Sequence, residues 1–499
     1  MKTIHLSLAA LAACTLATSA HAFSTDKLDM KNNMIITYKE KPKNIDTFKE
    51  MFSEGVLYGR LRSNTFYWDW ANENPGKTED NFAWGVGGSL LYSTGFLNGF
   101  GATAGFYTTY TLFTDNTDSD YPGKDFGKAG KDTYARLYGS GANIDVLAVA
   151  YLEYKFAKTD IKYGRQIFES TLLRSNDTKM IPNTFQGVAV ESKDLKDTKL
   201  RGAYFYLQKL RDHREFHSII AYDGWEQNDD AGVHKGLSVS NIEAAGKNVF
   251  PGMYVATLEN QSVPGLKINV DGMYIPEFVA SLIGELNYAV PLGGSGWTLT
   301  PGARYIQQFD EGAGKIGGAA LTGALGSDKT PSAAALASYD DPTSVNGGAW
   351  MARLALAKGP FDIMAGYSQI LDKADLIAPW RGFPTGGYTR SMAQYNWEAN
   401  TASWMVKTGF NFGKAGLVPG LYGALDYAYM DYDQKKIDAG TVTKTDRSIV
   451  HMDLVETLKS VPDLYLKFRT AYVSADKNPG AAKDYNSYSE YRFEMDYFF

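Results

Sequence analysis

This 499-residue sequence has few long apolar runs, a single cysteine and no excess of positive charge. After residue 22 no stretch approaches about 18 uninterrupted apolar residues, so the sequence predicts no transmembrane helix. The one cysteine, Cys14, lies near the N-terminus, which excludes a disulfide scaffold and a cysteine-ligated metal from the rest of the chain. The formal net charge of −6 gives no support to nucleic-acid binding.

The first 22 residues have the pattern of a Sec signal peptide. Lys2 precedes an apolar run from Ile4 to about Ala17, and Ala20-His-Ala22 has small residues at both key positions of an A-x-A cleavage site. We therefore expect cleavage before Phe23 and export of the mature chain. Leu11-Ala-Ala-Cys14 also resembles a lipobox, which would lipidate Cys14, but the apolar run continues past it to a better cleavage site.

What the sequence has in quantity is glycine and aromatic residues, 50 Gly, 33 Tyr and 26 Phe, as many short strands joined by glycine turns require. The last nine residues show the pattern most clearly. Apolar side chains at alternate positions are separated by Arg492, Glu494 and Asp496, so a strand here would have one apolar and one charged face. Only Phe498 breaks the alternation. The apolar positions are Tyr491, Phe493, Met495, Tyr497 and Phe499.

The same alternation recurs from Gly55 onward in segments of about ten residues, the length of a tilted membrane strand. In 144–156, for example, Ile144, Val146, Leu152 and Tyr154 are expected on one face. No separate layer is available to cover so many apolar faces, so lipid is the simpler partner. Bacterial barrels have even strand numbers, and the sequence predicts an all-β fold: a transmembrane antiparallel β-barrel of about 18 strands closed by the C-terminal strand.

Three segments stand apart from the predicted barrel of residues 52–499. Residues 23–51 form a polar lead-in, for which a short capped helix at 44–51 and disorder are both open. Residues 309–348 and 372–400 are too long for turns on the periplasmic side. We expect them to be extracellular loops, which leaves room for one to fold into the lumen.

Three blocks of sequence resemble the OprD-like family of outer-membrane porins. They are Arg62-Ser-Asn-Thr-Phe-Tyr-Trp-Asp69, Tyr163-Gly-Arg165 with 172–187, and Pro379-Trp-Arg381 with 382–397, the last of which resembles a Campylobacter-type branch. The lead-in and the 309–348 insert depart from the family pattern. The resemblance implies an 18-stranded, often trimeric diffusion channel of the Gram-negative outer membrane, in which lumen arginines of several members guide solutes that carry a carboxylate, often amino acids. It also implies that the terminal aromatic, Phe499 with Tyr497 in the same row, is read by the barrel-assembly machinery.

Alternation within each predicted strand selects candidate arginines for the channel lining. Arg60 and Arg62 fall opposite Leu57 and Leu61, and an arginine that faced hydrocarbon at the membrane midplane would cost about 2 to 4 kcal/mol. Two roles are open for such arginines: guiding solutes, or pairing with lumen acids such as Glu153 or Asp426. The candidate pore-lining residues are Arg60, Arg62, Arg165, Arg304 and Arg353.

The predicted function is passive diffusion of small hydrophilic solutes and ions, with no cofactor or metal. A barrel enzyme (phospholipase or protease) and a structural protein or adhesin are the alternatives. His213, Glu215 and His217 would share one face of a strand, but they lack the H-E-x-x-H spacing of a helical zinc site, so a polar row is the simpler interpretation. Expected partners are outer-membrane lipid, lipopolysaccharide, the assembly machinery and, in a homotrimer, further copies of the chain.

Overall fold

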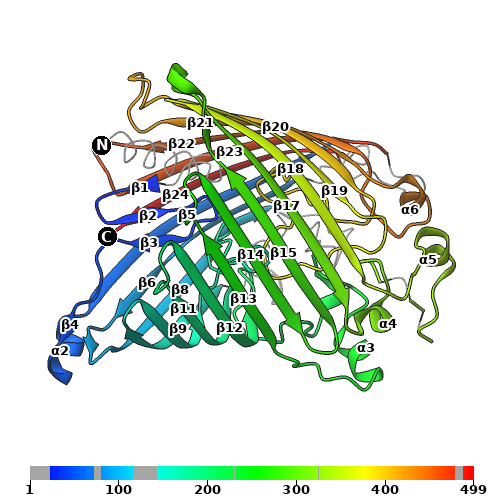
Figure 1. Cartoon of the computed structure of the whole chain (residues 1–499), viewed down its shortest axis with the longest axis horizontal. Coiled ribbons are helices and arrows are strands. Elements are labelled where there is room, and N and C mark those ends of the chain that lie inside the picture. The colour runs from blue at the N-terminus through cyan, green and yellow to red at the C-terminus, as the bar shows by residue number, and fades with distance from the viewer. Residues whose placement is uncertain are drawn as a thin grey trace.

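The computed structural model describes residues 23–71, 80–115, 143–228, 232–323, 325–326, 328–477 and 487–499. Within these ranges eighteen long strands form one closed antiparallel barrel (Figure 1). This confirms the fold class and the strand number expected from the alternation. The predicted signal peptide, residues 1–22, lies outside the described ranges. Cleavage after Ala22 therefore stays a prediction.

The barrel strands follow one another around the wall in chain order. Their bounds are β5 Val56–Trp70, β6 Asn81–Ser93, β8 Phe100–Asp115, β9 Ile144–Phe156, β10 Thr159–Gln166, β11 Thr184–Ser192, β12 Thr198–Lys209, β13 Met253–Asn260, β14 Leu266–Ile275, β15 Val279–Tyr288, β17 Thr298–Asp310, β18 Gly347–Lys358, β19 Phe361–Ile370, β20 Ala402–Asn411, β21 Tyr422–Asp431, β22 Arg447–Thr457, β23 Leu464–Ala475 and β24 Tyr488–Phe498. The short strands β4 Asn44–Ile45, β7 Phe96–Leu97 and β16 Val290–Pro291 extend the sheet.

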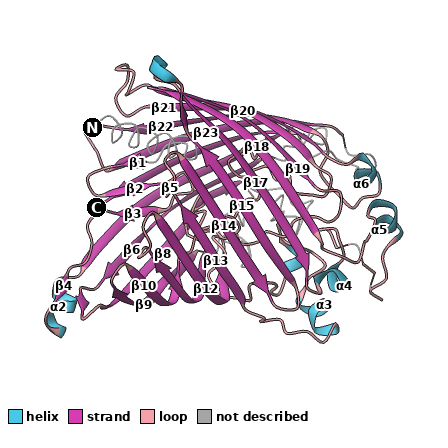
Figure 2. Cartoon of the chain, viewed as in Figure 1, coloured by secondary structure: helices cyan, strands magenta, loops and turns pink. Residues whose placement is uncertain are grey.

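The helices are short and lie at the two ends of the barrel (Figure 2). They are α2 Phe48–Ser53, α3 Val239–Ala244, α4 Ala313–Gly317, α5 Ala333–Ser338 and α6 Gln434–Asp438, with 3-10 turns η1 Trp225–Gln227 and η2 Gly293–Ser295. No helix in the described ranges has the length and apolar character needed to cross a membrane. Short turns join the strands at the end that carries α2, and long loops join them at the other end. In barrels of this class the turns face the periplasm and the loops face the cell exterior.

Strand β24 closes the barrel by pairing with β5, with Phe498 opposite Arg60 and Tyr488 opposite Trp70. The backbone of Phe499 continues the ladder, since its N–H donates to the Gly59 carbonyl (3.1 Å) and its carbonyl accepts from the Gly59 N–H (2.9 Å). Closure leaves the barrel sheet, as far as the structure describes it, without a free edge that could pair with another chain.

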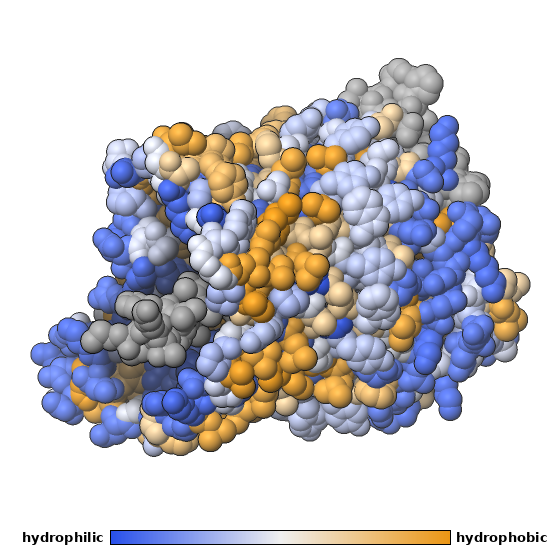
Figure 3. Space-filling view, turned by 45° about the horizontal axis from the view of Figure 1, so that its top comes forward, coloured by the Kyte–Doolittle hydropathy of each residue, from blue (hydrophilic) through white to orange (hydrophobic). Residues whose placement is uncertain are grey.

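The two faces of β24 meet different surroundings. Tyr491, Phe493, Met495, Tyr497 and Phe499 are about half exposed on the outside, where lipid would cover them, whereas Glu490, Glu494 and Asp496 are buried inside the barrel. Apolar side chains gather in the same way across the middle of the outer wall, between hydrophilic ends (Figure 3). Phe498 belongs to the inward row, and its side chain is buried there.

Strand β9 corrects one predicted face. Leu152 and Leu147 are both exposed, while Val146 and Ala148 are buried, so the alternation changes phase within the strand. The cause is a β-bulge in the β8–β9 pairing between Gly105 and Phe106, which leaves one β9 residue without an opposite partner. The expectation that residues 144–156 present one continuous apolar face is therefore wrong.

Two of the loops that the structure describes fold into the barrel. Residues 167–183 connect β10 to β11 and residues 371–401 connect β19 to β20, and they contact each other because the Gly382 N–H donates to the Leu172 carbonyl (2.9 Å) and the Arg174 N–H to the Trp380 carbonyl (3.0 Å). Trp380 and Trp397 are completely buried. These two loops narrow the lumen.

The polar lead-in has defined structure. It forms a three-stranded sheet, β1 Phe23–Ser24, β2 Leu28–Met30 and β3 Ile36–Tyr38, followed by helix α2. Thr47 and Glu50 close a capping box at the start of α2, because the Thr47 hydroxyl accepts from the Glu50 N–H and the Glu50 carboxylate accepts from the Thr47 N–H. The sheet lies at the turn end of the barrel beside β24 and β5 (Figure 1).

Candidate functional site: the channel cavity

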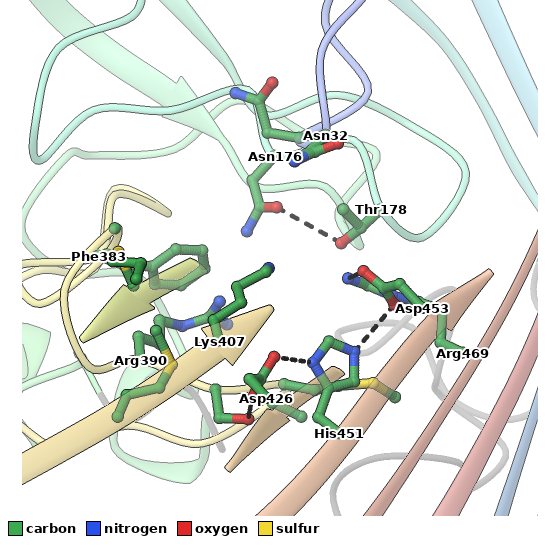
Figure 4. Close-up of a pocket in the computed structure, with 18 of the residues that line it drawn as sticks. Asn32, Asn176, Thr178, Phe383, Arg390, Lys407, Asp426, His451, Asp453 and Arg469 are labelled. Carbon is green, nitrogen blue, oxygen red and sulfur yellow. Dashed lines mark hydrogen bonds and ion pairs between the residues drawn. The ribbon is translucent and has the colours of Figure 1, made fainter. Parts of the chain in front are cut away.

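The inward loops leave a cavity of about 370 Å³ between themselves and the barrel wall. Loop 167–183 contributes Asn176, Thr178 and Lys179, and loop 371–401 contributes residues from Arg381 to Tyr395. The facing wall contributes side chains of β20 to β23. Figure 4 shows these side chains converging from opposite sides on an open centre. The principal wall residues are Lys407, Asp426, His451, Asp453 and Arg469.

A network of paired charges runs along this wall. His451 lies between two carboxylates, with Nδ1 2.7 Å from Asp426 and Nε2 2.9 Å from Asp453. Asp453 also accepts both Nε (2.7 Å) and Nη2 (3.0 Å) of Arg469, in the two-point geometry that makes such pairs strong. The Ser391 hydroxyl donates to Asp426 (2.6 Å) and so ties loop 371–401 to the wall. These acids are neutralised within the wall itself.

Two cations that line the cavity, Lys407 and Arg390, are not part of this network of ion pairs. Among the described residues no carboxylate lies within ion-pair distance, 4.0 Å, of the Lys407 amine or the Arg390 guanidinium. The Lys407 amine points toward the open centre of the cavity (Figure 4). Arg390 lies over the Phe383 ring, 3.5 Å from its centroid, a cation–π contact that leaves its positive charge in place. The cavity is therefore electropositive around these two side chains.

The charged residues that line the cavity are mostly cations. Counting the described residues only, eight arginines and lysines line the cavity against three aspartates. Five of these cations lie within ion-pair distance of a carboxylate, namely Lys179, Arg353, Arg381, Arg469 and Arg492, so the positive charge of the lining is carried chiefly by the others, which include Lys407 and Arg390. Two of the aspartates, Asp426 and Asp453, are the paired ones, and the third, Asp362, lies at the turn end of β19. A positive field in a low-dielectric channel raises the local concentration of anions.

The predicted arginines Arg60 and Arg62 lie inside the barrel but do not line this cavity. Both are buried, and both pair with Asp177 of loop 167–183, at 2.9 Å and 2.6 Å, and with Asp496 of β24, at 2.9 Å and 2.8 Å. Arg62 also pairs with Glu494. Their geometry is that of an anchor, which holds the inward loop against the wall.

Arg304 and Arg353 hold the other inward loop. Arg304 pairs with Glu285 (2.6 Å) and donates to the carbonyls of Pro384 (2.7 Å) and Gly386 (3.0 Å). Arg353 donates to the Gly387 carbonyl (2.8 Å), and both guanidiniums lie 4.8 Å from the centroid of the Tyr388 ring. Arg353 alone of the five predicted arginines also lines the cavity.

Arg165 corrects the prediction. It lies on the same side of the sheet as Tyr163, which is 60% exposed on the outer surface, and its guanidinium donates to the Leu147 carbonyl (3.0 Å) and lies 4.5 Å from the Phe216 ring centroid. It was a candidate because an arginine that faces hydrocarbon at the membrane midplane is costly, and no alternation in its own strand supported the choice. At the loop end of β10, the Leu147 carbonyl and the Phe216 ring stabilise the charge of Arg165, as water would in the lumen.

His213, Glu215 and His217 are not on a strand, so the prediction of a shared strand face is wrong. They belong to the segment after β12, where His213 Nδ1 lies 2.8 Å from His217 Nε2, with His213 buried and His217 partly buried. Burial lowers the pKa of His217 to about 4, which keeps its imidazole neutral at ordinary pH. The part of the chain that the structure describes contains no group of three or more potential metal ligands.

Sequence reasoning missed Lys407 and Arg390 as site residues. Lys407 falls on the polar face of its strand between Val406 and Thr408, so the signal was present but did not distinguish it from other inward lysines. Arg390 comes from an irregular loop, for which alternation predicts nothing.

A closed antiparallel barrel with an apolar outer belt and a polar lumen narrowed by its own loops defines a transmembrane channel protein. The family model described as outer membrane porin, OprD family, matches residues 57–499, so the chain belongs to the OprD family of outer membrane porins. It is accordingly a protein of the outer membrane of Gram-negative bacteria. No curated protein matches the chain.

Several solved structures share the fold. OccAB3 of Acinetobacter baumannii has a TM-score of 0.69 at 15% identity, covering 90% of this chain and 100% of that one. OpdK of Pseudomonas aeruginosa, solved with vanillate, has a TM-score of 0.65 at 16% identity over 90% and 99% of the two chains. A BenF-like porin from Pseudomonas fluorescens Pf-5 has a TM-score of 0.65 at 17% identity over the same shares. The Campylobacter-type branch stays a prediction.

Proposed function

We propose that this porin favours small solutes that carry a carboxylate, such as amino acids or small organic acids, and passes them by passive diffusion through the loop-narrowed cavity. The observation that carries the proposal is the pair Lys407 and Arg390, two neighbouring cations of the cavity lining that have no carboxylate within ion-pair distance among the described residues. A carboxylate entering from water would find two neighbouring charge-assisted donors, one from β20 and one from loop 371–401.

The surrounding lining supports a weak, transient site rather than a tight one. Phe383 and Tyr395 flank Arg390 and leave one wall apolar, while Asn176 and Thr178 present neutral polar groups opposite. A channel conducts only when a solute binds well enough to enter and loosely enough to leave. The OpdK structure of similar fold was solved with vanillate, itself a carboxylate, which is consistent with this class of solute.

A hydrolase in the same cavity is the weaker proposal. Ser391, Asp426 and His451 lie together, but both ring nitrogens of His451 are occupied by Asp426 and Asp453, and the Ser391 hydroxyl donates to Asp426 instead of to the imidazole. A serine nucleophile needs the imidazole as its base. The arrangement supports a structural role for these three residues.

The proposal is tested by ion selectivity in planar bilayers under a salt gradient. Lys407→Gln and Arg390→Gln each remove a positive charge from the cavity, so each should shift the reversal potential toward cations and lower the flux of small carboxylates by on the order of two- to tenfold. Lys435→Gln is the matched control, because Lys435 is an exposed lysine of α6 at the barrel rim. Unchanged selectivity in both cavity variants would contradict the proposal.

We also propose that the barrel-assembly machinery recognises Phe499 and Tyr497. We further propose that the protein contacts lipopolysaccharide and assembles into a homotrimer. The exposed aromatic row of β24 is the surface that supports the first of these.

A further inference from the structure

The N-terminal sheet lies on the lumen side of the barrel wall. Its apolar residues pack against Phe498, Tyr465 and Val455, which belong to the inward rows of β24, β23 and β22. The Phe23 ring lies 5.5 Å from the Phe498 ring and 5.3 Å from the Tyr465 ring, centroid to centroid, and Phe23 is only 3% exposed. This packing explains why an apolar residue, Phe498, occupies an inward position among charged ones.

The hairpin between β2 and β3 reaches from the turn end into the cavity. It turns at Lys31–Met34, where the Met34 N–H donates to the Lys31 carbonyl (2.8 Å) and Met34 adopts a positive φ of 65°. Asn32 and Asn33, at the tip of this turn, line the cavity together with Asn176 and Thr178 of the inward loop (Figure 4). Two neutral amides therefore face the space through which a solute would pass.

The same tip is bonded to the inward loop. The Asn33 carbonyl accepts from the Asp177 N–H (3.0 Å), and the Asn33 side-chain amide donates to Glu169 (2.9 Å). Asp177 is the residue whose carboxylate pairs with Arg60 and Arg62 of the wall. Sheet, loop and wall are thus joined through one aspartate.

Further contacts fix the sheet at its other end. Lys27 pairs with Asp463 of the β22–β23 turn (2.6 Å), and Tyr38 stacks on Tyr58 of β5 with ring centroids 4.0 Å apart. Leu28, Met30 and Met34 are all at most 2% exposed. Apolar burial on this scale holds the sheet as a fixed part of the barrel interior.

We propose that the sheet of residues 23–38 is an internal plug that forms the turn-end wall of the cavity, and that Asn32 and Asn33 at its tip help to determine which solutes pass. The proposal rests on the proposed channel function and adds to it a selectivity element outside the barrel strands. The plug narrows the periplasmic exit by its own bulk, and it sets the position of loop 167–183 through Asn33. Its neutral amides offer hydrogen bonds to a solute without adding a charge to the electropositive side of the cavity.

The first test is deletion of residues 23–38 behind the intact residues 1–22, followed by single-channel recording of protein that is still heat-modifiable. Removal of the plug should raise the conductance roughly twofold, because it widens the narrow part of the pathway. A deletion variant that folds and conducts at the wild-type level would overturn the proposal.

The second test uses point variants, which decide the matter if the deletion variant does not assemble. Asn32→Asp and Asn32→Lys should shift the reversal potential in opposite directions, because each places a charge in the conducting path. Thr37→Asp and Thr37→Lys are the controls, since Thr37 is an exposed residue of β3 that does not line the cavity. Equal reversal potentials for the two Asn32 variants would overturn the plug as a selectivity element. Wild-type protein that forms no channels would instead overturn the proposed function on which the plug depends.

Discussion

At the scale of single residues, charges inside this barrel divide into anchors and lining. Arg60, Arg62 and Arg304 are anchors, because carboxylates and loop carbonyls take up their donors, whereas Lys407 and Arg390 face the cavity without a carboxylate partner among the described residues. An inward arginine therefore does not by itself indicate a solute contact. What decides the role is which acid or loop lies next to it.

Asp177 offers a test of the anchoring role. Asp177→Ala removes two charge-assisted bonds between loop 167–183 and the wall, each worth about 1.5–3 kcal/mol, while Arg60 and Arg62 retain Asp496. The loop should then leave its docked position at least on the order of tenfold more often, visible as a second conductance level and greater open-channel noise, while the barrel stays heat-modifiable. Asp194→Ala, which removes a carboxylate at the exposed turn after β11, is the control. Wild-type noise in Asp177→Ala would contradict the anchoring role.

The sequence could predict which face of the barrel wall a residue occupies only for residues in strands. Alternation separated Arg60 and Arg62 from Leu57 and Leu61, and the structure has the same two rows, since the two arginines are buried and the two leucines are about 60% exposed. Alternation could not show that Asp177, more than a hundred residues away in an irregular loop, would cover these arginines. That contact depends on how two loops pack in three dimensions, which a period of two does not encode.

At the scale of elements, the strands were predictable and their irregularities were not. Closure by β24 followed from a chain end whose apolar row continues to Phe499. The bulge between β8 and β9 could not be predicted from the sequence, because Val146 and Leu147 are both apolar and either can face lipid. The sheet β1–β3 was missed because its strands are two or three residues long and gain their stability from the barrel interior.

The closing strand gives a prediction about assembly. Deletion of Phe499 removes the backbone bonds to Gly59 and the ring that covers that glycine, and it ends the aromatic row at Tyr497. The amount of heat-modifiable protein in the outer membrane should fall severalfold, with unassembled chain in the periplasm. Phe156→Ser is the control, because Phe156 is an exposed aromatic of β9 that lies away from the closing strand. Normal levels of assembled protein after the deletion would argue against Phe499 as an assembly signal.

At the scale of the whole molecule, the protein is a closed wall whose interior is filled from both ends. Loops 167–183 and 371–401 enter from the loop end, the N-terminal sheet enters from the turn end, and the cavity is the space that they leave. We infer that ions and solutes cross the barrel through this space.

The most direct test compares two neighbouring positions of β20, Lys407 and Val406, which the pleat points to opposite faces. Lys407 lines the cavity, and Val406 is 42% exposed on the outer surface. The only native cysteine is Cys14. In planar bilayers a negatively charged, water-soluble thiol reagent should lower the conductance of Lys407→Cys in discrete steps and leave Val406→Cys unchanged. Equal insensitivity of both variants, or block of Val406→Cys alone, would contradict the account.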